Sequence, residues 1–469
     1  MSARTHGPDG PVDLSGRGRH VHLVGIGGAG MSAIAEVLVA MGHRVSGSDR
    51  QESAVLARLR TLGIDARAGH DARNVEGADL VGVSTAIAGD NPEILRASGL
   101  GIPVLHRFAL LAAIGARRST LSISGTHGKT TTTAMTVAAL EGAGLAPGYI
   151  VGGEVVGRGS GARWSDGPWF VLEADESDST FLAPPRAGAV VTNVEADHLD
   201  HHGTFEALEA AFDRFVGETQ GPVVICADDP GSARLVAIRP DAITYGTSTG
   251  SRVRIDEVRV DGGAMSWSAR WDDGEEVRCR LPLPGLHLAR NATAALVLAV
   301  AVGAEPAAAR DGLAGYRGVG RRFEHRGRAG GVTFVDDYAH LPTEVRAVLD
   351  TAAAGDWSRV VAVVQPHRYS RTEATAADYA TVFEGVDVVV VTDVYAAGEA
   401  PRPGVSGKLV VDAVRRGGQV PVVEWWATRD ELVEGLLGLL RDGDLCLTLG
   451  AGDLTTLPDV LVPRLGGEA

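Results

Sequence analysis

The residues best suited to chemistry lie in one short segment, Leu121 to Thr133, which reads L-S-I-S-G-T-H-G-K-T-T-T-T. A short β-branched run meets a turn bounded by Gly125 and Gly128, and a helix is predicted from Thr131 to Leu140. The glycines allow backbone N–H groups to converge on an anion, and a helix N-terminus adds positive potential. The segment therefore predicts a phosphate-binding loop.

Lys129 and Thr130 add nucleotide chemistry to this loop. An ammonium group is a compact donor for terminal phosphate oxygens, and a threonine hydroxyl can hold Mg²⁺. Only Lys129 and Lys408 are lysines among 44 basic residues, so a lysine at this place is not expected by chance. The G-x-x-G-K-T spacing is shorter than a Walker A loop, and an incidental glycine turn is the alternative. The predicted ATP-binding residues of the loop are Gly125, Thr126, His127, Gly128, Lys129, Thr130 and Thr131.

A second glycine-rich turn comes earlier in the chain. A buried strand from His20 leads into Gly25-Ile26-Gly27-Gly28-Ala29-Gly30, a complete G-x-G-x-x-G, and Asp49 follows 19 positions after Gly30. The pattern indicates a pyrophosphate on a helix N-terminus and a carboxylate near a ribose, which a UDP-sugar offers as well as NAD. Plain α/β packing is the alternative. The predicted UDP-sugar residues are Gly25, Gly27, Gly28, Ala29, Gly30, Ser32, Asp49 and Ser84.

Carboxylates follow the strands expected to flank the phosphate loop. Strand 169–172 ends in E-A-D-E-S-D, which begins at Glu173, and strand 187–194 ends in E-A-D-H-L-D, which contains His198. Mg²⁺ requires hard oxygen ligands in addition to phosphate oxygens. Thr130, Glu173 and His198 are therefore the predicted metal ligands, with a solvated acidic loop as the alternative.

The rest of the chain repeats the strand-then-polar-cluster scheme. Residues 252–283 alternate with a period of two, which predicts an antiparallel meander. Four later strands each end in a polar cluster, which indicates one ligand-facing edge. The predicted fold class is α/β with three domains, each a mainly parallel sheet flanked by helices: a disordered tail at 1–19, a Rossmann-like domain at 20–118, a central P-loop ATPase-like domain with the meander at 119–325, and a C-terminal Rossmann-like domain at 326–469.

Composition narrows the class of protein. A net charge of -15 without a basic block argues against nucleic acid or an anionic membrane as a partner. Three scattered cysteines predict no disulfide framework, and no apolar run has transmembrane length. We expect a soluble protein of the cytoplasm.

In this order, G-T-H-G-K-T, E-A-D-E-S-D, T-N-V-E-A-D-H-L-D, R-R-F-E and D-D-Y-A-H make the chain resemble the Mur ligase family from end to end. The motifs G-I-G-G-A-G-M-S, Q-P-H-R-Y-S-R-T and D-V-Y-A-A-G-E are similar to those of members that join L-alanine to UDP-N-acetylmuramate. The resemblance implies an ATP-dependent amide-bond ligase acting through an acyl phosphate, with Mg²⁺, as a monomer or weak homodimer. It also implies catalytic roles for Lys129, Glu173, His198, Arg322 and His340, and ATP contacts from Asn291 and Asp336.

The chain departs from the family pattern in a few places. Leu341 and Leu288 stand where members often have histidine and asparagine. Some related ligases carry a carbamylated lysine near a second metal, and this chain has no lysine to serve there. His198 and Glu173 are the candidates for that place, and because imidazole suits Mn²⁺ we expect Mn²⁺ to be tolerated. An NAD-dependent oxidoreductase, a non-catalytic nucleotide-binding regulator and another Mur-type ligase are the alternatives.

Overall fold

The first of three β-sheets follows directly from the alternation of apolar strands and helices near the N-terminus. A computed structural model describes residues 12–261 and 263–467. The elements of the first sheet are β1 (His20–Val24), β2 (Arg44–Asp49), β3 (Asp65–Ala68), β4 (Leu80–Val83) and β5 (Val104–His106), with α1 (Ala29–Ala40), α2 (Ala54–Thr61), α3 (Pro92–Gly99) and α4 (Arg107–Gly115). The strands are parallel in the order β3-β2-β1-β4-β5.

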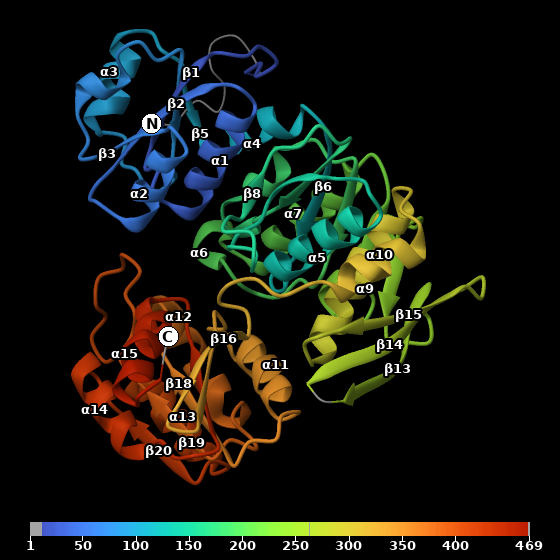
Figure 1. Ribbon diagram of the computed structural model, residues 1–469, viewed down its shortest axis with the longest axis vertical. Coiled ribbons are helices and arrows are strands. Elements are labelled where there is room, and N and C mark those ends of the chain that lie inside the picture. Colours follow the sequence, from blue (N-terminus) through green and yellow to red (C-terminus); the bar gives the residue numbers. More distant parts are fainter. Residues whose placement is uncertain (1–11, 262, 468–469) are drawn as a thin grey trace. The chain divides into compact units, whose positions relative to one another are not determined.

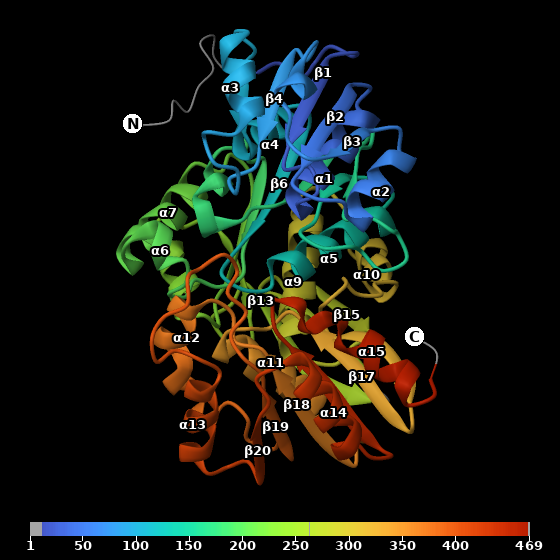
Figure 2. The same ribbon diagram turned by 90° about the vertical axis from the view of Figure 1, so that its left-hand side faces the viewer.

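Helices cover both faces of this sheet, so β1 and β4 are buried along their whole length. Side chains of α1, α2 and α4 pack on one face, and α3 packs on the other (Figure 2). Leu14 is 2% exposed and belongs to the first of these cores. Residues 1–11 of the predicted tail lie outside the described residues, and in the remainder Leu14, with the partly buried Val12, packs in this core.

The second sheet is mixed and carries the phosphate loop. Its strands are β6 (Ser119–Ser124), β7 (Gly148–Ile150), β8 (Ala162–Arg163), β9 (Trp169–Glu173), β10 (Gly188–Val191), β11 (Val223–Cys226), β12 (Ile243–Gly246), β13 (Val253–Asp261), β14 (Ala264–Trp271) and β15 (Glu276–Leu281). Its helices are α5 (Lys129–Gly142), α6 (Leu199–His202), α7 (Phe205–Gly217), α8 (Pro230–Ala233), α9 (Leu286–Ala301) and α10 (Pro306–Ala314).

The order β15-β14-β13-β12-β11-β10-β6-β9-β7-β8 places β6 between β10 and β9. The strands on either side of the phosphate loop are therefore the two whose carboxyl ends carry the acidic segments. The phosphate loop and both acidic segments therefore lie at the same edge of the sheet, which is the candidate site. The strands β13, β14 and β15 lie at one edge, as the period of two predicts.

The third sheet is again mainly parallel, with order β16-β17-β21-β18-β19-β20 and only β16 antiparallel to its neighbour. Its elements are β16 (Glu324–Ala329), β17 (Val332–Asp337), β18 (Arg359–Val364), β19 (Val388–Val391), β20 (Val422–Trp425), β21 (Asp444–Leu449), α11 (Pro342–Ala352), α12 (Tyr369–Thr375), α13 (Lys408–Gly417), α14 (Arg429–Leu439) and α15 (Leu457–Arg464). Helices α11 and α13 pack on one face, and α14 and α15 on the other (Figure 1).

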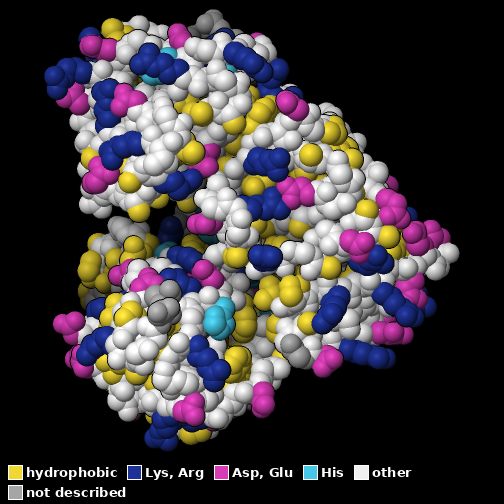
Figure 3. All heavy atoms as spheres, in the orientation of Figure 1, with side chains coloured by type: hydrophobic (Ala, Val, Ile, Leu, Met, Phe, Trp, Pro, Cys, Tyr) yellow, Lys and Arg dark blue, Asp and Glu magenta, His cyan; other side chains and the backbone are white. Residues whose placement is uncertain are grey.

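The predicted α/β fold class with three sheets is confirmed. The chain forms two compact units, of which one contains the first sheet and most of the second, and the other contains the third. The predicted boundary at 325/326 falls inside β16, so the third sheet starts slightly earlier than predicted. The other domain limits stay a prediction. Acidic and basic side chains are interspersed over the face seen in Figure 3.

Candidate functional site

The phosphate loop joins β6 to α5 through a four-residue turn that requires glycine at both ends. Gly125 has φ +134°, and a Cβ there would lie 2.1 Å from Thr192 Oγ1. Gly128 has φ +79°, and a Cβ there would lie 3.0 Å from Asn291 Oδ1. The helix begins at Lys129, two residues before its predicted start. The structure thus brings the predicted nucleotide residue Asn291 beside the loop.

Residues that follow β10 hold the loop in shape. The Thr192 hydroxyl donates to the carbonyl of His127 at 2.6 Å, and the N–H of His127 donates to Asn193 Oδ1 at 2.7 Å. The N–H of Glu195 donates to Thr126 Oγ1 at 2.8 Å. These bonds tie the two middle residues of the turn, Thr126 and His127, to the residues that follow the neighbouring strand β10.

Lys129 lies across the loop and faces the buried carboxylate of Glu176. Its Nζ donates to the carbonyls of Gly125 and Thr126 at 2.8 and 3.1 Å and to Glu176 at 2.9 Å. Burial would lower the pKa of Lys129, but the carboxylates of Glu176 and Asp175 outweigh burial and raise it. The lysine therefore stays charged in a water-poor site, as a phosphate ligand must.

Glu173 lies at the end of β9, beside the first turn of α5. The Thr130 hydroxyl donates to its Oε1 at 2.9 Å, and the N–H of Gly152 donates to its Oε2 at 2.6 Å. Burial raises the pKa of Glu173 despite these contacts and the positive charge of Lys129. A buried carboxylate whose charge is only partly compensated gains from a nearby cation. The predicted pair of Thr130 and Glu173 is thus in direct contact.

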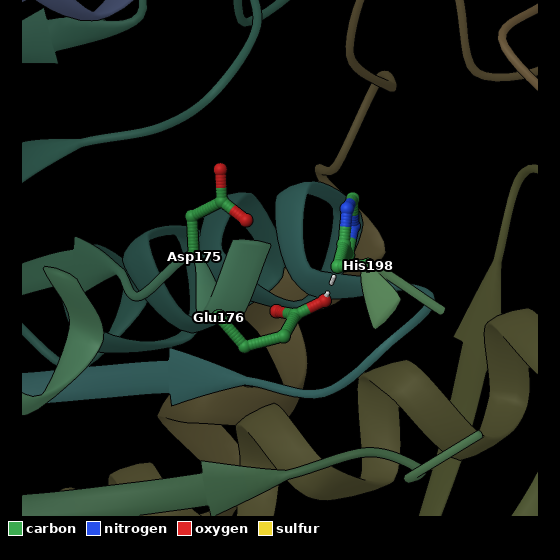
Figure 4. Close-up of side chains that lie close together, drawn as sticks. All are labelled: Asp175, Glu176 and His198. Carbon is green, nitrogen blue, oxygen red and sulfur yellow. Dashed lines mark ion pairs between the residues drawn. The ribbon is translucent and has the colours of Figure 1, made fainter. Parts of the chain in front are cut away.

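His198 belongs to a neighbouring group with Asp175 and Glu176, shown in Figure 4. One ligand atom from each lies within 4.8 Å of the others. His198 Nε2 is 3.8 Å from Glu176 Oε1 and 3.3 Å from Asp197 Oδ2. Burial raises the pKa of Glu176 to about 7. Sequence reasoning named Glu173 and missed Asp175 and Glu176, although the E-A-D-E-S-D run contained all three.

These groups fit a divalent cation. The carboxylate and hydroxyl oxygens are the hard ligands that Mg²⁺ prefers, and the imidazole of His198 suits Mn²⁺. Glu176 is fully buried and has a raised pKa, so a cation would stabilise its ionised form. Thr131, the remaining predicted loop residue, is buried in the first turn of α5.

The first glycine-rich turn joins β1 to α1. Gly25 has φ +82°, Gly28 precedes the helix, and Ala29 is its first residue. The N–H of Gly27 donates to Asp49 Oδ2 at 2.8 Å. The predicted acidic residue therefore lies directly against the turn.

The other predicted residues of this site have local partners. The Ser32 hydroxyl donates to the carbonyl of Ala29 at 3.0 Å, so it braces the first turn of the helix. Ser84 follows β4 and accepts from the N–H of Ala86 at 3.4 Å. Sequence reasoning missed Arg107, whose Nη1 would be 2.7 Å from a Cβ at Gly30. Arg107 Nη2 is 3.5 Å from Asp178 Oδ2. Arg107 is far from Gly30 in the sequence, so no motif spacing connects the two.

In the third sheet, the carboxylate of Asp336 is bonded to residues of the same domain. Its carboxylate is 1% exposed and accepts from the hydroxyls of Thr448 and Thr455 at 2.5 and 2.7 Å. Arg322 lies over the ring of Tyr338 at 5.0 Å. The predicted contact of Asp336 with ATP stays a prediction, and the observed partners give it a structural role as well.

His340 joins residues from two further strand ends. Its ring is 5.4 Å from that of His367, which stacks on Tyr395 at 5.7 Å. Burial, with the nearby charges of His340 and Arg371, lowers the pKa of His367 to about 3. The loops that follow β17, β18 and β19 therefore bring these three rings together. Sequence reasoning recorded the motif around His367 but did not name that residue as part of a site.

Family models match the chain in three consecutive parts: the Mur ligase family catalytic domain at residues 20–119, the Mur ligase middle domain at 123–299 and the Mur ligase glutamate ligase domain at 321–452. The chain belongs to the Mur ligase family. Membership explains the second phosphate loop and its acidic neighbours, which an NAD-dependent oxidoreductase leaves unexplained.

Individual Mur ligases resemble the chain over nearly its whole length. The UDP-N-acetylmuramate--L-alanine ligase of Kineococcus radiotolerans is 48% identical, over 97% of this chain and 98% of that protein. The ligase of the same name from Thermobifida fusca is 41% identical, over 98% and 99%. The crystal structure of UDP-N-acetylmuramate-alanine ligase from Thermotoga maritima matches with a TM-score of 0.81 at 29% identity, over 95% of this chain and 98% of that one. Within the described part of this Mur ligase, no helix is long and apolar enough to cross a membrane.

Proposed function

We propose that this Mur ligase joins L-alanine to the carboxylate of UDP-N-acetylmuramate with ATP, in the synthesis of peptidoglycan precursors. The observation that carries the proposal is Lys129, which lies in the glycine-bounded phosphate loop and faces the carboxylates of Glu173, Asp175 and Glu176. Full-length relatives named for this reaction support the choice of substrates.

The loop residues act in the phosphoryl-transfer half of the reaction. Lys129 and the N–H groups from Gly125 to Thr130 bind the terminal phosphates of ATP, and Thr130, Glu173 and His198 would hold Mg²⁺. When bound, the cation neutralises charge on the phosphate oxygens. Attack by the sugar carboxylate on the γ-phosphoryl group forms an acyl phosphate and releases ADP, and Lys129 stabilises the charge that develops during transfer.

The second half is amide formation. The neutral amine of alanine attacks the acyl carbonyl, and phosphate leaves from the tetrahedral intermediate. Arg322 and His340 are the proposed catalytic residues of the third domain, and Asn291 and Asp336 are the proposed further contacts to ATP. Holding the reactants in line lowers such a barrier by roughly 7 to 11 kcal/mol in well-oriented cases. We place the reaction in the cytoplasm, with the enzyme as a monomer or weak homodimer and without nucleic-acid or membrane partners.

The test is phosphate release from ATP with UDP-N-acetylmuramate and a panel of single amino acids that includes alanine, glycine and serine. We expect release that requires both the nucleotide-sugar and an amino acid and is fastest with L-alanine. Release that is fastest with a different amino acid would point to another ligase of the family. Release independent of any amino acid would contradict ligation.

A further inference from the structure

A polar cluster lies inside the first domain, on the sheet face that α3 covers. Glu93, in the first turn of α3, is fully buried. The Ser48 hydroxyl donates to its Oε2 at 2.5 Å, and Asn74 Nδ2 donates to its Oε1 at 2.6 Å. Burial would raise the pKa of Glu93, but interactions with His22, Ser48 and Asn74 outweigh burial and lower it to about 2. Glu93 is therefore a carboxylate that can only accept hydrogen bonds.

This arrangement determines which nitrogen of His70 carries the proton. His70 Nδ1 lies 2.9 Å from Ser48 Oγ and 3.3 Å from Glu93 Oε2. The single hydroxyl proton of Ser48 is donated to Glu93, so toward His70 both oxygens can only accept. Nδ1 must donate, and in the neutral ring Nε2 is then an acceptor with a lone pair directed away from the cluster.

His70 lies at the carboxyl edge of the sheet, close to the glycine-rich turn. It follows β3 by two residues, and the last residue of β3, Ala68, pairs with Asp49 of β2. The N–H of Gly69 donates to the carbonyl of Asp49 at 2.7 Å, while the carboxylate of Asp49 binds the N–H of Gly27. The His70 side chain is 16% exposed, and Nε2 has no hydrogen-bond partner within residues 12–261 and 263–467.

We propose that His70 Nε2 accepts a hydrogen bond from the uridine of the nucleotide-sugar, and that Glu93 and Ser48 are positioning residues that fix the orientation of its ring. The inference rests on the proposed function, which places UDP at this edge. A lone pair attracts a hydroxyl or N–H donor and repels a phosphate oxygen, so the contact is to the nucleoside and not to the diphosphate. Uridine offers two kinds of donor, the ribose hydroxyls and the uracil N3–H.

The experiment measures binding of UDP and three analogues, 2′-deoxy-UDP, 3′-deoxy-UDP and N3-methyl-UDP, to the full-length protein by calorimetry. We expect one analogue to bind the unaltered protein roughly 3- to 10-fold more weakly than UDP, which is the usual size of one lost hydrogen bond. The analogue that weakens binding identifies the donor.

Two substitutions of His70 separate its inward and outward contacts. His70→Asn keeps a donor near Ser48 and Glu93 but has no outward acceptor, whereas His70→Gln places an amide oxygen near the position of Nε2. His70→Asn should bind UDP roughly 3- to 10-fold more weakly and should no longer distinguish UDP from the critical analogue. His70→Gln should recover most of the affinity. His325→Ala, an exposed histidine in β16, is the control and should behave as the unaltered protein.

The outcomes are distinct. If His70→Asn binds UDP normally, or still discriminates the analogue as the unaltered protein does, the role of His70 is wrong while UDP binding stands. If the unaltered protein binds no UDP, the proposed function itself fails. Should His70→Asn not fold, Ser48→Ala removes the acceptor for Nδ1. Loss of analogue discrimination in that variant supports the proposal, and retained discrimination overturns it.

Discussion

The two glycine-rich turns of this Mur ligase share a local design but differ in their surroundings. Each joins a buried strand to a helix N-terminus that can bind an anion. The first turn is backed by the carboxylate of Asp49, which accepts from Gly27, and no lysine is present in its domain. The second contains Lys129, which faces several buried carboxylates. The first arrangement suits holding a diphosphate, and only the second suits phosphoryl transfer.

The buried carboxylates near the two turns differ in the same way. Glu93, near the first turn, is surrounded by hydrogen-bond donors, and its pKa is lowered to about 2. Glu173 and Glu176, near the second, have raised pKa values because burial outweighs their contacts. A carboxylate surrounded by hydrogen-bond donors fixes structure, whereas an incompletely compensated one is stabilised by a nearby cation. The two turns therefore differ in whether the buried carboxylate beside them is stabilised as an anion by its own contacts, as Glu93 is, or is left under-compensated, as Glu173 and Glu176 are.

The largest expected effect comes from Lys129. Lys129→Ala should reduce ligation roughly 100- to 1,000-fold, because a charged donor to the transferring phosphoryl group is lost. UDP-sugar binding, measured by calorimetry, should be nearly unchanged. Lys408→Ala is the matched control, since this second lysine lies over Trp425 in the third domain. A Lys129→Ala enzyme that retains a tenth of normal turnover would refute the assignment.

A substitution of Glu93 tests whether its ionised carboxylate stabilises the first domain. Because its pKa falls from 4.5 to about 2 on folding, its ionised form should stabilise the first domain at neutral pH by about 3 kcal/mol, and this contribution should disappear as the pH falls from about 4.5 to 2. Glu93→Gln should therefore lower the free energy of unfolding at pH 7 much more than at pH 3. Urea unfolding followed by hydrogen exchange of β1 and β2 measures the difference. If Glu93→Gln lowers the free energy of unfolding equally at pH 7 and at pH 3, the ionised state assigned to Glu93 is wrong.

His198 tests the metal side. His198→Ala should lower ligation by at least the roughly 10- to 100-fold that a change behind a metal ligand costs, because His198 is itself a proposed ligand, and ATP binding should be largely kept. Mn²⁺ should replace Mg²⁺ in the unaltered enzyme, and added bicarbonate should have no effect because no lysine is available for carbamylation. The matched control is His201→Ala, which removes a neighbouring histidine on α6 that is not a proposed metal ligand. Normal activity of His198→Ala would end the metal role.

The smallest expected effect concerns the first turn. A Cβ at Gly28 would meet only the carbonyl of Gly25, at 3.5 Å, so Gly28→Val should fold and project into the space of a diphosphate. UDP-sugar binding should weaken roughly 10-fold or more, since overfilling a packed site costs about 1–3 kcal/mol. ATP binding should be unaffected. Loss of ATP binding in a folded Gly28→Val protein would reverse the assignment of the two turns.

Sequence reasoning found the parts of the site that are local in the chain. The strand, glycine turn and Lys129 form one continuous segment, and Glu173 follows directly from an apolar strand, so spacing alone located them. Arg107 and Glu93 had no such signal. Arg107 reaches Gly30, and Glu93 reaches Ser48, only because α4 and α3 fold back on the sheet. A contact between residues so distant in sequence depends on packing rather than on local pattern.

The most direct test of the account is a crystal structure with UDP-N-acetylmuramate, a non-hydrolysable ATP analogue and Mn²⁺, using the anomalous signal of manganese. We expect the UDP diphosphate at Gly27 to Gly30, the ATP phosphates at Gly125 to Thr130, and a manganese peak within bonding distance of His198 or Glu173. The account would be contradicted by a UDP diphosphate on the loop of Lys129, or by manganese bound away from both His198 and Glu173. Either result would show that the two turns do not bind the ligands assigned to them.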